Sequence, residues 1–246
     1  MSCVTFSTEM IKIDLHMHTG EDPYDGLSYP ATALIDKASA FGYGAIAITL
    51  HDKVLEDERY FEYARQKGVL LIRAVEWTIQ NLDVLLYNVT QREVDAIRSF
   101  EDLRAFRRAK GDDILVIAPH PFFPVHQSLR HQLIEHIDLF DAIEHAQLHL
   151  PWLNFNPRAI RVAQQYRKPI VANSDAHNLW MFGRHYTLVD ATPEVHAIFA
   201  AIRQNRLEWH SPPVTVWECL KMFVVEPVLH RKKHRIVSSF PAQSAK

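Results

Sequence analysis

The chain has 246 residues, enough for one large domain or two small ones with a substantial core. Hydrophobic residues make up 48% and charged residues 23%, which argues against disorder, collagen and coiled coils, and the formal charge of −2 gives no global attraction to nucleic acid or an anionic membrane. The opening residues 1–10 are polar, unlike a signal peptide, and no apolar run is long enough to span a bilayer. Cys3 and Cys219 lie far apart and predict free thiols, so we expect a cytoplasmic protein with no membrane partner.

Short apolar runs rich in Val, Ile and Leu predict buried parallel strands. In chain order they are Ile11–Leu15, Ala45–Thr49, Val69–Val75, Leu82–Tyr87, Ile114–Ala118, Ala142–Ile143 and Pro169–Ala172. Helical patterns lie between them, at 30–41, 57–67, 94–106, 128–137, 157–166 and 193–205. This alternation is typical of an α/β domain with a mostly parallel sheet or barrel. With 7 glycines and no linker, we expect a single domain over 1–225 and a basic tail over 226–246.

Metal-ligating side chains stand at the carboxyl ends of five predicted strands. They are His16 with His18, His51, Glu76, His120, and Asp175 with His177. Strand ends of this kind converge in parallel α/β folds, and burying so many ionisable groups without a cation would cost several kcal/mol. Imidazoles and carboxylates without a nearby cysteine suit Zn, Mn or Fe. The pattern therefore predicts two or three divalent ions, with Glu76 as the natural bridge between them.

The same residues belong to a longer series of motifs, D-L-H-x-H-T, D-G, T-L-H-D, V-E, H-P and S-D-A-H. They lie at Asp14–Thr19, Asp25–Gly26, Thr49–Asp52, Val75–Glu76, His120–Pro121 and Ser174–His177. Over roughly residues 11–190 the series resembles the PHP (polymerase and histidinol phosphatase) family. The resemblance implies a distorted (β/α)7 barrel that hydrolyses phosphate esters with up to three metal ions. It also implies three ligand sets: His16, His18, Glu76 and Asp175; Glu76 and His120; and Asp25, His51 and His177.

Three departures from the family's pattern leave alternatives open. Leu50 stands where the family usually has an aspartate. The loop after the first motif is two residues longer than usual, so Glu21 and Asp22 remain alternatives to Asp25 as its ligand. The strand after the central glutamate lacks the histidine that members with a full cluster carry. Either Asp83 replaces it there, or the second ion is weakly held.

The most direct chemistry of such a cluster is hydrolysis of a phosphate ester by a metal-bridging hydroxide. Arg184 is the best-placed candidate to neutralise the phosphate oxygens, and His145 to protonate the leaving group, to act as a further ligand or to orient one. The sequence thus predicts a metal-dependent phosphoesterase acting on a small phosphorylated metabolite or nucleotide. The alternatives are an amidohydrolase-like metal-dependent hydrolase and a PHP module that binds metal without turnover. The net charge argues against long nucleic acid as a partner.

Overall fold

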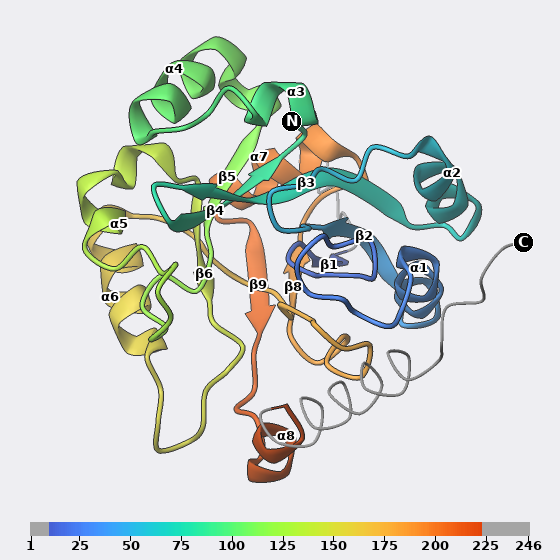
Figure 1. Cartoon of the computed structure of the whole chain (residues 1–246). Helices are drawn as coiled ribbons and strands as arrows, with labels where there is room; N and C mark the ends of the chain where they lie inside the picture. Colours follow the sequence, from blue (N-terminus) through green and yellow to red (C-terminus); the bar gives the residue numbers. More distant parts are fainter. Residues whose placement is uncertain (1–9, 223–246) are drawn as a thin grey trace, which may run out of the picture. The chain divides into compact units, whose positions relative to one another are not determined.

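The computed structural model describes residues 10–222 (Figure 1). The chain divides into two compact units, one of Met1–Gln147 with Phe155–Pro212, the other of Leu148–Asn154 with Pro213–Lys246. The predicted tail and Cys3 lie outside the described residues, and Cys219 is a free thiol. None of the helices within 10–222 has both the length and the apolar character needed to cross a membrane.

The first unit is built on one sheet of nine strands, in the order β7-β6-β5-β4-β3-β2-β1-β8-β9 over the described residues. The strands are β1 Ile11–Asp14, β2 Tyr43–Ile48, β3 Leu70–Ile79, β4 Leu82–Tyr87, β5 Leu115–Ala118, β6 Ala142–His145, β7 Ile170–Ala172, β8 Tyr186–Val189 and β9 Leu207–His210. The hydroxyl of Thr187 in β8 both accepts from the N–H of Ala172 and donates to its carbonyl, each over 2.9 Å, which joins β8 to β7. The sheet is therefore a nearly closed barrel, and the predicted α/β barrel is confirmed, with more strands than seven.

The expectation of parallel pairing is wrong for one of the predicted strands, β4, and β8 is an antiparallel strand that was not predicted. β4 runs antiparallel to both β3 and β5, and β8 runs antiparallel to β1 and β9. Gln80 and Asn81, which alone connect β3 to β4, both have positive φ (51° and 65°), as a tight hairpin turn requires. A parallel pair needs a crossover of a dozen or more residues, so this connection forces the antiparallel direction.

Helices surround the sheet, with α1 and α2 on one side of it and α4, α5 and α6 on another (Figure 1). The helices are α1 Ala31–Ala40, α2 Glu58–Gln66, α3 Gln91–Val94, α4 Phe100–Lys110, α5 Gln132–Glu135, α6 Asn156–Tyr166 and α7 Val195–Arg203, with α8 Val216–Leu220 in the second unit. The helix predicted over 94–106 is interrupted, because Ser99 caps α4 by accepting from the N–H of Asp102. The helix predicted over 128–137 is reduced to α5 and a 3₁₀ turn at Ile137–Leu139.

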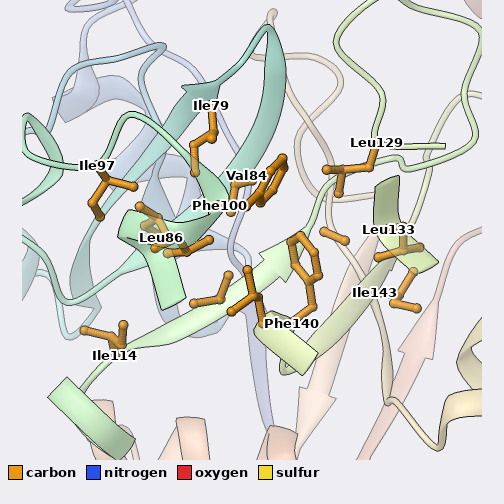
Figure 2. Packing of buried hydrophobic residues seen from close by; sticks show 14 of the residues in the cluster. Ile79, Val84, Leu86, Ile97, Phe100, Ile114, Leu129, Leu133, Phe140 and Ile143 are labelled. Atoms are coloured by element: carbon orange, nitrogen blue, oxygen red, sulfur yellow. The ribbon is translucent and has the colours of Figure 1, made fainter. Parts of the chain in front are cut away.

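Two apolar clusters bury the two faces of the sheet. Leu85 of β4 lies in the cluster that fills the barrel interior together with α7, whereas its neighbours Val84 and Leu86 lie in the cluster beneath the outer helices. Phe100 and Phe140 belong to this outer cluster, part of which is drawn in Figure 2. Since apolar side chains, including those of α7, fill the interior, polar groups are confined to the carboxyl ends of the central strands.

Candidate metal centre

All eight predicted ligands come together at one end of the barrel. His16 and His18 follow β1, His51 follows β2, Glu76 lies within β3, His120 follows β5, Asp175 and His177 follow β7, and Asp25 comes from the loop before α1. A single parallel bridge between His51 and Glu76 extends the pairing of β2 with β3, and another between Met17 and Ala176 joins the segments that follow β1 and β7. The alternation of side chains then directs His16 and His18, two residues apart, to the same side.

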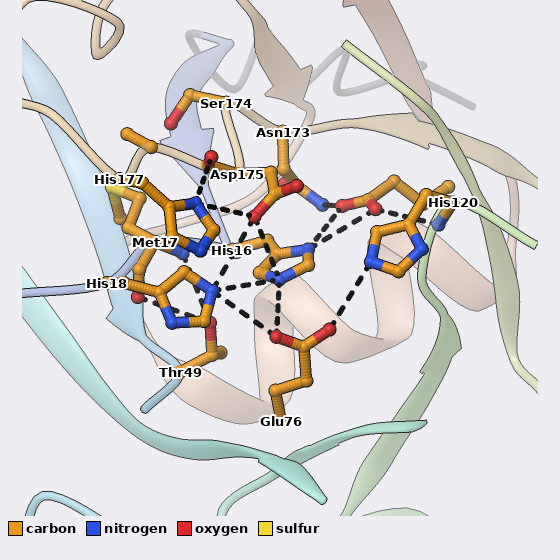
Figure 3. Close-up of polar contacts among 12 residues, drawn as sticks. His16, Met17, His18, Thr49, Glu76, His120, Asn173, Ser174, Asp175 and His177 are labelled. Atoms are coloured by element: carbon orange, nitrogen blue, oxygen red, sulfur yellow. Dashed lines mark hydrogen bonds and ion pairs between the residues drawn. The ribbon is translucent and has the colours of Figure 1, made fainter. Parts of the chain in front are cut away.

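The carboxylate of Glu76 contacts several of the imidazoles, and Figure 3 shows its contacts with His16, His18 and His120. Its Oε2 lies 3.2 Å from Nε2 of His16, 3.3 Å from Nε2 of His18 and 3.4 Å from Nε2 of His51. Its Oε1 lies 3.3 Å from Nε2 of His120. One buried carboxylate thus faces four imidazoles, with its two oxygens turned to different sides.

The ligand atoms fall into three overlapping groups, in each of which all atoms lie within 4.8 Å of one another. The groups are His18, Asp25, His51 and His177; His16, His18 and Asp175; and His16, Glu76 and His120. His16 and His18 each belong to two groups. An arrangement that shares ligands in this way suits ions a few ångströms apart, as in sites with two or more metals.

The chemistry of the donors fits divalent cations. Oδ2 of Asp25 and Oε1 of Glu76 are buried and make no hydrogen bond to the part of the chain that is described. Burial lowers the pKa of His16, but Glu144 and Glu76 outweigh it and hold that pKa well above its usual value. Burial likewise raises the pKa of Glu76, yet His16 and the other imidazoles hold it well below its usual value. Both shifts have the same cause, the close pairing of carboxylates with imidazoles, and the carboxylates attract positive charge to the cluster.

Glu144 in β6 positions two of the ligands. Its carboxylate lies 3.1 and 3.2 Å from Nδ1 of His16 and accepts from the N–H of His120 at 3.0 Å and from Nδ2 of Asn173 at 2.8 Å. When Nδ1 of His16 carries the proton and donates it to Glu144, Nε2 of the same ring is free to bind a cation. His120 and Asp175 have φ of 27° and 43°, a strained conformation that such anchoring maintains.

The loop ligand named from sequence, Asp25, lies among the histidines, with its Oδ2 3.3 Å from Nε2 of His177. Asp22 contacts the same cluster through the Nδ1 atoms of two imidazoles. Its carboxylate lies 3.3 Å from Nδ1 of His18 and 3.0 Å from Nδ1 of His51. Glu21 points elsewhere and accepts from the backbone N–H at the start of α1. Of the three alternatives, Asp25 therefore has the geometry of a ligand and Asp22 that of a residue orienting two imidazoles.

Asp83 belongs to none of the three groups found among the described residues. It is buried, and burial together with the nearby Glu76 raises its pKa to about 7. It lines a cavity of about 660 Å³ that also contains Asp25 and His51. The cavity thus adjoins the cluster, and Asp83 forms part of its wall.

The two residues predicted for catalysis, His145 and Arg184, occupy different parts of the structure. Glu144 faces the cluster, and the next side chain along β6, His145, stacks instead on Trp209 with ring centroids 4.7 Å apart. The structure does not bring His145 into the cluster. Arg184 is half-buried in the segment between β7 and β8, which also carries Asp175. Glu144 is the residue that sequence reasoning missed, and the alternation of side chains along β6 is the signal that could have found it.

Comparisons with known proteins agree with this architecture. Residues 154–207 match the family model described as PHP-associated. A two-domain protein from Bacteroides vulgatus containing a predicted PHP-like metal-dependent phosphoesterase has a similar structure, with TM-score 0.63 and 21% identity over 82% of this chain and 64% of that one. The resemblance to the PHP family is confirmed.

Two further solved structures have a fold similar to that of this chain. PsfC from Pseudomonas syringae has TM-score 0.59 and 16% identity, over 91% of this chain and 98% of its own. The lesion-specific endonuclease PfuEndoQ from Pyrococcus furiosus has TM-score 0.54 and 19% identity, over 79% and 56%. The chain therefore spans less than two thirds of the Bacteroides and Pyrococcus proteins. No curated protein matches the sequence.

Proposed function

We propose that this protein is a metal-dependent phosphoesterase that hydrolyses a small phosphorylated metabolite or nucleotide. The observation that carries the proposal is the position of Glu76, whose two oxygens face His16, His18 and His51 on one side and His120 on the other. A carboxylate so placed is suited to bridge cations, and paired cations are the usual means of stabilising both the attacking and the leaving oxygen of a phosphate ester.

The three groups described above would hold two or three ions of Mn, Zn or Fe, because their donors are only imidazoles and carboxylates. When bound, such ions lower the pKa of a coordinated water and neutralise charge on the phosphate. The remaining work falls to the chain. Glu144 and Asp22 fix the orientation of the imidazoles, and Arg184 would donate to the non-bridging phosphate oxygens. We assign no step to His145, because its ring stacks on Trp209.

The test is hydrolysis of p-nitrophenyl phosphate by purified protein, with and without chelator and added manganese, with bound metal quantified on the same sample. His16→Ala and Asp175→Ala should abolish turnover and lower the metal content while the protein remains folded. His131→Ala, at an exposed histidine before α5, is the matched control and should change neither.

The outcomes separate the proposed function from its alternatives. Turnover that is lost with chelator and regained with metal supports it, and unchanged turnover in His16→Ala or Asp175→Ala would contradict it. Bound ions without hydrolysis of any phosphate ester, including short oligonucleotides, would favour amide or lactone substrates or a module without turnover.

A further inference from the structure

The cavity beside the ligand cluster has the size and position of a substrate pocket. Its volume of about 660 Å³ lies within the usual range for small-molecule sites. Asp25 and His51 line it and also belong to one of the ligand groups, so the cavity opens directly onto the cluster. A phosphate held at the cluster would project its ester group into this space.

The strand register places one wall of the cavity immediately beyond Glu76. Thr78 lies two residues further along β3 on the same face, and Asp83 of β4 is its direct partner across the hairpin. Because Glu76 points into the cluster, Thr78 and Asp83 are the next side chains outward on that face. A leaving group passing out from the cluster meets the hydroxyl of Thr78 and the carboxyl of Asp83.

The chemistry of the lining is polar but offers no counter-charge to an anion. Asn81, His126 and Gln127 add amide and imidazole groups, and no lysine or arginine lines the cavity among the described residues. Asp52 is already engaged, since its carboxylate accepts from the N–H of Thr78 at 2.8 Å and lies 3.3 Å from its hydroxyl. Carboxyl, amide and hydroxyl groups together can donate to and accept from several alcohol groups.

We propose that this cavity binds the leaving group of the substrate, and that this group is a neutral polyhydroxy moiety, a polyol or a sugar, without a second phosphate. The inference rests on the proposed phosphoesterase activity. A second phosphate would stand beside Asp83, and no lysine or arginine among the described residues of the lining could pair with it, which is unfavourable in a partly buried space. Tyr24, 71% exposed at the edge of the cavity, offers an aromatic face to the apolar side of a sugar ring.

The test compares four phosphate esters at saturating metal: p-nitrophenyl phosphate, a hexose monophosphate, the corresponding hexose bisphosphate and phosphoethanolamine. We expect kcat/KM for the hexose monophosphate to exceed that for the bisphosphate by about tenfold or more, and phosphoethanolamine tests the competing case of a cationic leaving group beside Asp83. Asp83→Ala should raise KM for the hexose monophosphate by about tenfold more than it raises KM for p-nitrophenyl phosphate, because the aryl group has no hydroxyl to bind there.

A second variant adds a positive charge to the lining of the cavity. Gln127 is exposed, so Gln127→Arg should fold normally and raise kcat/KM for the bisphosphate by about fivefold or more through a new charge-assisted contact. Gln164→Arg makes the same change on an exposed position of α6 and should have no effect.

The outcomes distinguish failure of this inference from failure of the proposed function. No turnover of any ester at full metal loading would contradict the phosphoesterase activity itself. Turnover of p-nitrophenyl phosphate with equal or better use of the bisphosphate or of phosphoethanolamine would overturn only the polyhydroxy leaving group. An unchanged bisphosphate rate in Gln127→Arg would show that the cavity does not receive the leaving group.

Discussion

Replacing Glu144 with glutamine tests how far the cluster depends on a residue outside it. Three donors converge on the carboxylate: Nδ1 of His16, the N–H of His120 and Nδ2 of Asn173. Glutamine has one acceptor oxygen, so its amide N–H₂ must face at least one of these donors. Losing one hydrogen bond to a charged group costs about 2 kcal/mol, and we therefore expect metal affinity to fall by roughly 30-fold.

The assay is calorimetric titration of chelator-treated protein with manganese, together with turnover of p-nitrophenyl phosphate at saturating metal. The control is Glu101→Gln, which makes the same chemical change at an exposed residue of α4 whose carboxylate pairs with Arg104. This variant should bind metal normally. Wild-type affinity and turnover in Glu144→Gln would refute the view that Glu144 sets the tautomer and orientation of His16.

Three further predictions concern stability and proton competition. Asp141→Ala leaves the guanidinium of Arg107 without its buried partner, which should cost about 3 kcal/mol and lower Tm by about 10 °C in a thermal melt. Gly183→Ala should destabilise by about 2 kcal/mol in urea unfolding, because Gly183 has φ 105° and a Cβ there would lie 2.6 Å from the ring of Phe41; an unchanged midpoint would contradict this. Burial lowers the pKa of His120, but Glu76 outweighs it and raises that pKa to about 9, so protons compete with metal below this pH. Metal affinity measured at pH 6, 7 and 8 should therefore increase at each step, and a flat profile would count against it.

The strands of the barrel could be predicted where apolar runs are continuous, and so could the parallel pairing of most of them, but the antiparallel direction of β4 could not. Leu82–Tyr87 is as apolar as a parallel strand because it is buried on both faces, and only the positive φ of Gln80 and Asn81 reveals the hairpin. β8 and β9 were not predicted, since β8 alternates buried and half-buried residues and β9 is exposed along most of its length. Neither strand therefore forms the continuous apolar run by which the other strands were recognised.

The positions of the predicted ligands followed from one physical rule, that carboxyl ends of neighbouring strands converge. This rule also led to His145, which ends β6 but stacks on Trp209. Alternation decides between neighbours: Ile143 packs in the outer cluster, so Glu144 faces the ligands and His145 faces away. The rule for strand ends has to be combined with the apolar pattern of each strand to predict which side chain at that end faces the ligand cluster.

The seam between β7 and β8 has a consequence for local opening of the fold. β7 and β9 stand at the two ends of the strand order, and the hydroxyl of Thr187 replaces the regular ladder where the barrel closes. A seam held by side-chain bonds opens at lower free energy than a continuous ladder, so amide hydrogens of β7 should exchange with solvent before those of β2 or β3. Asp175 and His177 follow β7 directly. Mild denaturant should therefore abolish metal binding while most of the helix and strand content is still intact.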